Sequence, residues 1–327
     1  MKPIFILQSV LCCFIALNAQ AQQVDYSVVS VPEESGVDFK KITTDNDYVC
    51  MPIVNRTSKG VTWLTNRIID ISTNGLTIAY LSYRNNSSNI FIKDISKQGS
   101  SIQRTNRAGI IDFSYSPDGT SICFSESRNG NNQIYITDAT NGYVCRQITS
   151  GAFDYSPVYT TDMKSIFFAR QEQNGVSIWS YSVVDNFLSS FTSGMNPVLI
   201  PNKSEYICTR TNSKGHGEIW KINYETGVEE CIISDVNRSF TSPVLSPNGQ
   251  KILFVGASAL YVNEKKTYFN TDIFVCNIDG SGFSQLTYHA ADDLSPIWSK
   301  DGEHIYFISQ RGSADAAANI WRMNFYH

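Results

Sequence analysis

An all-β fold built from six four-stranded units is predicted by three features of the 327-residue chain. An isoleucine followed by Phe, Tyr or Trp recurs six times, and each copy starts a strand of alternating apolar residues. A tight turn and an apolar strand precede each copy, and the strand that follows it closes on Thr or Ser in five of the six. The six isoleucines are Ile90, Ile134, Ile178, Ile219, Ile273 and Ile320. A repeat of 41 to 54 residues made only of strands is typical of propeller blades, so we predict a six-bladed β-propeller.

The first 21 residues have the pattern of a secretory signal peptide. Lys2 gives a positive start, an apolar run extends over residues 4–17, and residues 19–21 read Ala-Gln-Ala, a small-residue cleavage motif. We therefore expect export to the periplasm, with the cell surface as a further possibility. Acylation of Cys12 or Cys13 is the less favoured alternative, because neither follows a small residue. No later stretch reaches 18 apolar residues, so we expect no membrane span.

Composition and cysteine placement exclude two further classes. A net charge of −4 with 17% charged residues gives no basic surface for nucleic acid. Cys123 and Cys145 fall on the second and fourth strands of one unit, as do Cys208 and Cys231. Such positions lie roughly 9–10 Å apart, beyond the roughly 7 Å reach of a disulfide. Six cysteines remain once the signal peptide is removed, and we predict that all six are free, buried thiols: Cys50, Cys123, Cys145, Cys208, Cys231 and Cys276.

Within each unit the four strands, here called a to d, are separated by recognisable turns. The a–b turns are Asn-Gly or Asp-Gly steps, which supply the positive φ of a tight hairpin. The third and fourth units have Met163 and Lys203 in place of the glycine. Five b strands lead into an arginine: Arg84, Arg128, Arg170, Arg210 and Arg311. One arginine per unit at the same strand end favours a structural anchor over an anion-binding ring.

The sixth unit ends after its c strand, so we expect its d strand to come from the N-terminal segment. Residues 39–43 and 61–65 both resemble d strands. A proline follows the closing Thr or Ser by nine residues in two other units, and Pro52 follows Thr43 at the same distance. We therefore predict that residues 39–43 pair with 319–324. Residues 55–66 then form an insertion in the first unit.

The repeats resemble a known family at this point. SPDG at 116–119 with QIYITDATNGYVCRQITSG, and SKDGEHIYFISQRGSADAAANIW from residue 299, are similar to the PD40, or WD40-like, repeat of TolB-type six-bladed propellers. The resemblance covers about residues 39–327, after a signal peptide (1–21) and a tail (22–38). It implies an exported, non-enzymatic scaffold that binds cell-envelope proteins, and we expect a monomer without cofactor. TolB carries an α/β domain before its propeller, so its own partnership is not implied here.

Four polar residues just before the a strands are candidates for the mouth of the channel: Asp112, Asp154, Asn196 and Asp293. Converging carboxylates could bind a cation or a basic ligand. The favoured interpretation is that they hold turns by bonding backbone amides.

Enzymatic propellers carry metal clusters or paired acids in the channel, as in the oligogalacturonate lyases. The histidines, His216, His289, His304 and His327, occupy different repeat positions, so we predict no metal site. A carbohydrate- or lactone-processing enzyme, or a small-ligand binder using the channel, remains the alternative function.

The b–c hairpin of the fifth unit, residues 256–272, is about ten residues longer than the others. It carries aromatic and cationic residues, a composition favoured at interface cores: Tyr261, Lys265, Lys266, Tyr268 and Phe269. We predict either a partner contact or a hairpin whose aromatics fold onto the neighbouring unit.

Overall fold

The structure is a computed structural model that describes residues 26–326, apart from 53, 58–59, 64–66, 98, 108 and 263–264. The side chains of 55–57, 60–63, 259–262 and 265–269 also lie outside the description. The described chain is all-β, with two short 3-10 helices, η1 (Pro32–Glu34) and η2 (Asp45–Asp47). None of its helices has the length and apolar character needed to cross a membrane. The predicted signal peptide lies outside the described residues.

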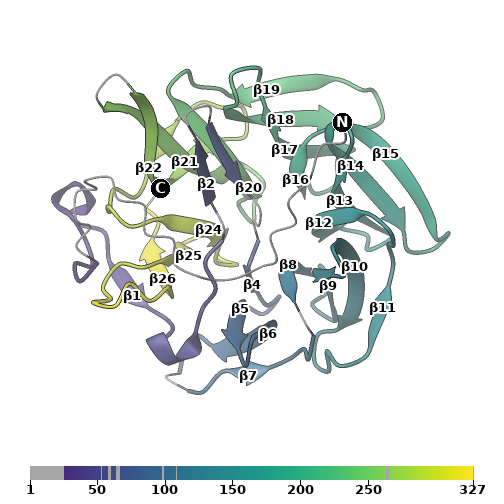
Figure 1. The fold of residues 1–327 in the computed structure, drawn as a ribbon, viewed down its shortest axis with the longest axis horizontal. Helices are drawn as coiled ribbons and strands as arrows, with labels where there is room; N and C mark the ends of the chain where they lie inside the picture. The colour runs from purple at the N-terminus through teal and green to yellow at the C-terminus, as the bar shows by residue number, and fades with distance from the viewer. Residues whose placement is uncertain are drawn as a thin grey trace, which may run out of the picture.

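Six groups of four strands surround a central axis, each group starting with its a strand near that axis (Figure 1). Neighbouring strands within a group are antiparallel, so the predicted all-β propeller architecture is observed. The first three units are β4 (Ile69–Ile71), β5 (Thr77–Arg84), β6 (Ser87–Asp94) and β7 (Ile102–Gln103); β8 (Ile110–Tyr115), β9 (Ser121–Arg128), β10 (Asn131–Asp138) and β11 (Cys145–Gln147); and β12 (Phe153–Tyr159), β13 (Ser165–Glu172), β14 (Gly175–Ser182) and β15 (Phe187–Ser193). The other three are β16 (Met195–Leu199), β17 (Glu205–Thr211), β18 (Gly217–Asn223) and β19 (Glu229–Ile233); β20 (Arg238–Leu245), β21 (Lys251–Val262), β22 (Lys265–Asn277) and β23 (Ser284–Gln285); and β24 (Asp293–Trp298), β25 (His304–Ser309), β26 (Asn319–Asn324) and β1 (Phe39–Lys41).

The a–b turns are held by a hydroxyl residue that precedes the Asp or Asn by two positions. Ser116 Oγ donates to Asp118 Oδ1 at 2.5 Å and accepts the N–H of Ser121 at 3.0 Å. Gly119 completes the turn with a φ of 72°. The fourth unit has Ile200 in place of the hydroxyl residue, and there the positive φ moves to Asn202. The sequence departure noted in that unit is therefore a real difference in turn geometry.

The recurrent Ile of strand c and the recurrent Thr that closes strand d are hydrogen-bonded to each other. In four units the isoleucine N–H donates to the threonine Oγ1 at 2.8–3.0 Å. The pairs are Ile90–Thr105, Ile134–Thr149, Ile273–Thr287 and Ile320–Thr43. This bond explains why the two positions keep a near-constant spacing in the sequence.

The N-terminal strand β1 completes the sixth unit. It pairs antiparallel with β26, with Phe39 opposite Met323 and Lys41 opposite Trp321. Thr43 makes the same bond to Ile320 that the internal d strands make within their own units. The predicted pairing of residues 39–43 with 319–324 is thus present. The rejected candidate, residues 61–65, falls mostly in β3 (Gly60–Trp63), which pairs with β2 (Val54–Thr57) in a separate hairpin.

Residues 26–37, whose placement the sequence left open, lie along the b–c connection of the sixth unit. The N–H of Gly312 donates to the carbonyl of Val28 at 2.8 Å. Arg311 is fully buried and binds both Glu34, at 3.1 Å, and Asp293, at 2.5 Å. This part of the predicted tail is therefore part of the folded structure.

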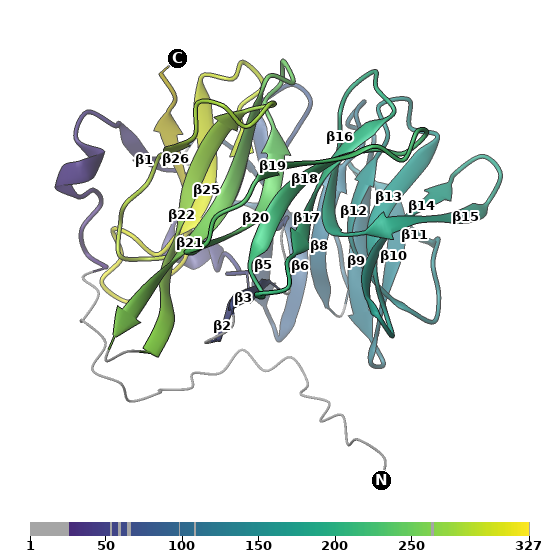
Figure 2. The same cartoon turned by 90° about the horizontal axis from the view of Figure 1, so that it is seen from above.

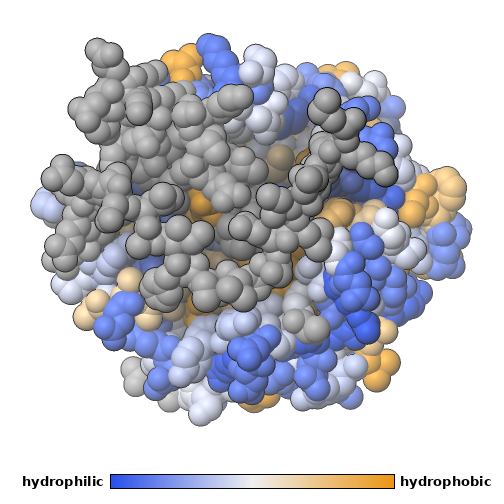
Figure 3. Space-filling model, in the orientation of Figure 1, coloured by the Kyte–Doolittle hydropathy of each residue, from blue (hydrophilic) through white to orange (hydrophobic). Residues whose placement is uncertain are grey.

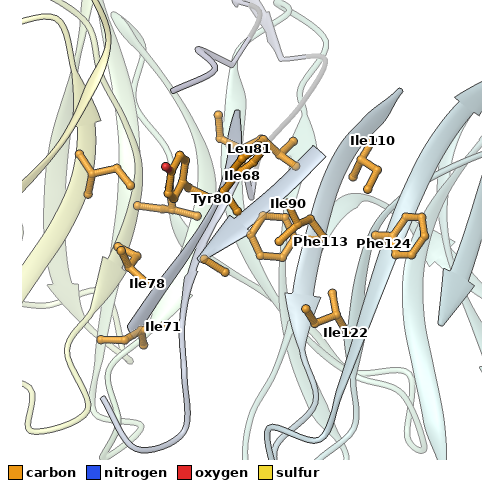
Figure 4. Close-up of a cluster of buried hydrophobic side chains, with 14 of the residues drawn as sticks. Ile68, Ile71, Ile78, Tyr80, Leu81, Ile90, Ile110, Phe113, Ile122 and Phe124 are labelled. Carbon is orange, nitrogen blue, oxygen red and sulfur yellow. The ribbon is translucent and has the colours of Figure 1, made fainter. Parts of the chain in front are cut away.

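The core is divided among the seams between units, because each unit packs on two neighbours. Figure 4 shows the seam of the first two units, where Tyr80, Ile90, Phe113 and Phe124 are buried with several isoleucines.

All six cysteines are free, as predicted. The prediction that all six are buried is wrong, because Cys231 is exposed and Cys50 and Cys145 are half-buried. Cys145 and Cys231 lie on d strands at the rim of the disc, where burial is incomplete.

An arginine stacks on the aromatic residue that follows the recurrent Ile in five units. The guanidinium carbon lies 4.2–5.8 Å from the ring centroid, a cation–π distance. The pairs are Arg84–Phe91, Arg107–Tyr135, Arg170–Trp179, Arg210–Trp220 and Arg238–Phe274. Arg128 was expected to be the anchor of the second unit, but it is exposed and Arg107 takes that place. An arginine can reach the ring from before strand a as well as from the end of strand b.

We expect Thr43→Val to lower the free energy of unfolding by about 1–3 kcal/mol, because the buried N–H of Ile320 loses its acceptor. Urea denaturation of the purified protein measures this change. Thr105→Val removes the same bond from an internal unit and is the matched control, with a loss of similar size. A neutral Thr43→Val beside a destabilising Thr105→Val would contradict closure through β1.

Candidate functional site

The innermost strand is interrupted by a β-bulge at a Ser-Pro or Asn-Pro step in the third to sixth units. Proline has no N–H for the strand ladder, and the pairing register shifts at each of these steps. The residue before each proline has a φ of 50–57°: Ser156, Asn196, Ser242 and Ser295. Non-glycine residues pay about 1 kcal/mol or more in this region, so four strained residues surround the channel at one level.

The prolines, the bulge residues and the aliphatic residue after each proline line the central channel. They enclose a space of about 30 Å³, which is room for one or two water molecules. Among the residues that line this space, Arg67 alone is charged. On the face seen in Figure 3, hydrophilic side chains occupy most of the visible rim of the disc, so the channel differs in character from the outer surface.

Arg67 precedes β4 and is half-buried. Among the described residues, no side chain or backbone group forms a hydrogen bond or ion pair with its guanidinium. A second space of about 180 Å³, on the face of the a–b turns, is also lined by Arg67 and adds Asp70, Trp298 and Lys300. Arg67 therefore stands where the narrow channel meets a wider mouth.

Of the four predicted channel residues, Asn196 lines the channel and the three aspartates do not. Asp154 is fully buried and accepts two hydrogen bonds from Arg170, at 2.7 and 2.9 Å. Asp293 is fully buried against Arg311. The repeat places Asp112 and Asn196 two residues further along strand a than Asp154 and Asp293, so the four side chains do not share one ring.

Asp112 and Asn196 join neighbouring units. The carboxylate of Asp112 accepts the N–H of Ser156 at 2.7 Å, and Asn196 Nδ2 donates to Thr241 Oγ1 at 3.0 Å. Burial raises the pKa of Asp112 to about 7, against the opposing effects of the Ser156 N–H and of Arg67. These contacts agree with the favoured structural interpretation of the predicted residues. Sequence reasoning missed Arg67 and the three serines, although the repeated Ser-Pro step was a signal for the latter.

The three described histidines lie apart from one another. His216 Nδ1 contacts the carbonyl of Asp235 at 3.2 Å, and His289 Nδ1 accepts the N–H of Ala291 at 2.9 Å. His304 groups with Asp301 and Glu303 within 4.8 Å on an a–b turn, where both carboxylates are exposed. Asp301 there holds its own turn by accepting from Ser299 and from the N–H of Glu303.

The long hairpin of the fifth unit is present as β21 and β22, of 12 and 13 residues. Figure 2 shows it projecting beyond the disc. The side chains of Tyr261, Lys265, Lys266, Tyr268 and Phe269 lie outside the described part of the structure, so their role in partner contact stays a prediction.

A buried acidic cluster lies at the base of that hairpin. Asp272 is buried close to Asp293, Glu34 and Asp292, with Arg311 as the neighbouring cation. Burial, followed by repulsion from these carboxylates, raises the pKa of Asp272 to about 9. The carboxyl is therefore protonated in the folded protein at neutral pH.

We expect the free energy of unfolding to fall as the pH rises from about 5 to 9. Above its ordinary pKa the Asp272 carboxyl ionises freely in the unfolded chain, while the folded protein holds it protonated up to about pH 9. Asp272→Asn keeps the shape without ionising, so it should reduce this slope, leaving the part that arises from Asp112 and Asp293. It should also stabilise the protein at pH 8 by at least about 1.4 kcal/mol, the value of one pKa unit. Urea denaturation across this pH range is the measurement.

Asp138→Asn is the control, because Asp138 is exposed and its pKa is lowered by Thr140. That carboxyl is ionised in both states above pH 5, so its slope should match the wild type. Equal slopes for Asp272→Asn and wild type would show that Asp272 ionises normally.

Known proteins share this architecture. The chain is similar to a putative TolB from Agrobacterium tumefaciens (TM-score 0.58, 15% identity, covering 89% of this chain and 98% of that one). It is also similar to an oligogalacturonate lyase from Vibrio parahaemolyticus (TM-score 0.59, 10% identity, covering 92% and 96%). Dipeptidyl-peptidase 5 of Porphyromonas gingivalis is 30% identical over 70 residues, which are 21% of this chain and only 10% of the peptidase. At these identities the two structures show the fold alone. The TolB beta propeller domain family, PD40, matches residues 23–261, and the chain belongs to that family.

Proposed function

We propose that this propeller is an exported, non-enzymatic binding protein of the cell envelope whose channel mouth accepts an acidic group of a partner protein. The observation that carries the proposal is Arg67, a cation at the junction of the two channel spaces whose guanidinium donates no hydrogen bond to the described residues. Among the described residues, the Arg67 guanidinium interacts electrostatically with Asp112 but donates no hydrogen bond. Its N–H donors can therefore bind a carboxylate, whose geometry matches a guanidinium.

The channel walls favour binding without rearrangement. Prolines fix the backbone beside Arg67, so little conformational entropy is lost when a ligand group enters. The inner space of about 30 Å³ is too small for a whole sugar ring or a folded element. A side chain or a chain end of a partner, entering through the mouth of about 180 Å³, fits these dimensions.

The export part of the proposal rests on residues 1–21, whose basic start, apolar run and Ala-Gln-Ala motif are those of a signal peptide. Membership of the TolB propeller family supports a periplasmic protein that works through protein contacts. We infer a monomer whose partner is another envelope protein.

The alternative is an enzyme acting on a carbohydrate or lactone, or a small-ligand binder. Similarity to an oligogalacturonate lyase at 10% identity argues for the fold and not for that activity. The residues that line the inner channel include no His, Asp or Glu, so the described lining offers no general acid or base.

Capture of envelope proteins on the immobilised chain tests the proposal. Arg67→Gln should reduce recovery of a specific partner at least about tenfold, because the carboxylate loses its bidentate contact. Lys214→Gln, which removes an exposed charge from a b–c connection, is the control and should capture normally. The melting temperature of each variant separates lost binding from lost folding. Capture that is insensitive to Arg67→Gln, or turnover of polygalacturonate or gluconolactone by the wild type, would contradict the proposal.

A further inference from the structure

A cleft of about 680 Å³ lies between the third and fourth units and shares no lining residue with the channel. It opens among the a–b turns of both units, at residues 160–162 and 202–204. Its size falls within the range of small-ligand sites in proteins, roughly 300–1,000 Å³. Neither membership of the family nor the function proposed for the channel assigns a role to this cleft.

Three aromatic rings form one wall of the cleft. Phe167 stacks on Phe191 with ring centroids 5.1 Å apart, and Tyr224 lies 5.6 and 5.9 Å from these two rings. Tyr206 packs against Tyr224 at 6.4 Å and is fully buried. Its hydroxyl has no hydrogen-bond partner among the described residues. The wall is therefore a continuous aromatic surface between two units.

Two of these aromatic residues, Tyr206 and Phe191, are peculiar to this seam. The repeat supplies an internal comparison, because each position has a counterpart in the other five units. Tyr206 stands where every other unit has isoleucine: Ile78, Ile122, Ile166, Ile252 and Ile305. Phe191 stands where the others have Arg104, Ile148, Ile233, Leu286 and Ile42. The fold packs without aromatics at these positions, so the scaffold itself does not require them.

The turns that border the cleft depart from the repeat as well. The glycine of the a–b turn is replaced by Met163 and Lys203 in these two units alone. Aromatic substitutions and altered turns thus coincide at one of the six seams. A single seam that differs in both respects is the pattern expected when a repeated scaffold acquires a binding site.

Hydroxyl groups with free hydrogen-bonding capacity line the same cleft. Ser165, Ser180 and Tyr224 contribute hydroxyls for which the described residues provide no hydrogen bond. The charged residues of the lining are Asp162 and Lys203, both on the turns. Asp162 accepts from Thr160 and from the N–H of Lys164, and Lys203 lies 3.7 Å from Glu205. The inner part of the cleft is therefore aromatic, hydroxylated and uncharged.

We propose that this cleft binds a neutral carbohydrate of one or two pyranose rings. The C–H face of a sugar ring is apolar and packs on an aromatic face, while its hydroxyls both donate and accept hydrogen bonds. Phe191 and Tyr224 supply the stacking surface, and Ser165 and Ser180 supply donors and acceptors. A charged ligand would find no fixed counter-charge inside the cleft. The site is independent of the function proposed for the channel.

Saturation-transfer NMR on the mature full-length chain tests the proposal, with cellobiose, maltose and diacetylchitobiose as probes. We expect transfer to the ring protons of at least one probe. The double variant Phe191→Ile, Tyr224→Ile installs residues that other units carry at these positions, so the fold should persist. It should weaken binding at least about tenfold, because the stacking surface is gone.

Phe187→Ser is the matched control, because Phe187 lies on the same strand β15 but is exposed and outside the cleft lining. It should bind as the wild type does, and so should Arg67→Gln, which separates this site from the channel. Ser180→Ala, which removes one inner hydroxyl, should also weaken binding and serves if the double variant unfolds. The proposal is overturned if no probe receives saturation, if binding survives the double variant, or if decaproline displaces the sugar and binds more tightly, which would indicate a peptide groove.

Discussion

The bond between the hydroxyl of Thr43 and the N–H of Ile320 is the interaction on which the ring depends. The two residues are 277 positions apart in the chain, and they repeat a contact that three other units make between their own neighbouring strands. Without it and the β1–β26 pairing, the sixth unit would present an open sheet edge and the first would lose a packing partner. Because the core is shared among seams, a fault at one seam exposes apolar surface on two units.

Much of this architecture could be predicted from the sequence, because each structural feature of a unit recurs at the same spacing in several units. The fixed distance from Ile to Thr reflects a hydrogen bond, and the distance from Thr to Pro located the closing strand. Features that occur once could not be read in this way. The position of residues 26–37 is fixed by the ion pair between Arg311 and Glu34. No sequence pattern indicates that these two residues pair.

The candidate site was harder to predict for the same reason. The sequence suggested that three aspartates converge on the channel. In the structure all three are buried: Asp112 accepts a hydrogen bond from the next unit, and Asp154 and Asp293 each pair with an arginine. Arg67 comes from a unit that lacks the Ser-Pro step, so no pattern marked it. For the cleft between the third and fourth units, the sequence signal was the replacement of two turn glycines by Met163 and Lys203. Its aromatic wall joins residues of different strands, so no local stretch of sequence marks it.

The closing strand also determines when the ring can form during synthesis. The chain is made from its N-terminus, so β1 is complete long before β26, the described strand that it pairs with, has been made. Contacts of such large sequence separation form late, because the entropy of closing the intervening loop must be overcome first. The ring therefore cannot close before β26 has been synthesised. The same latch that stabilises the finished disc is therefore the last part of the ring to form.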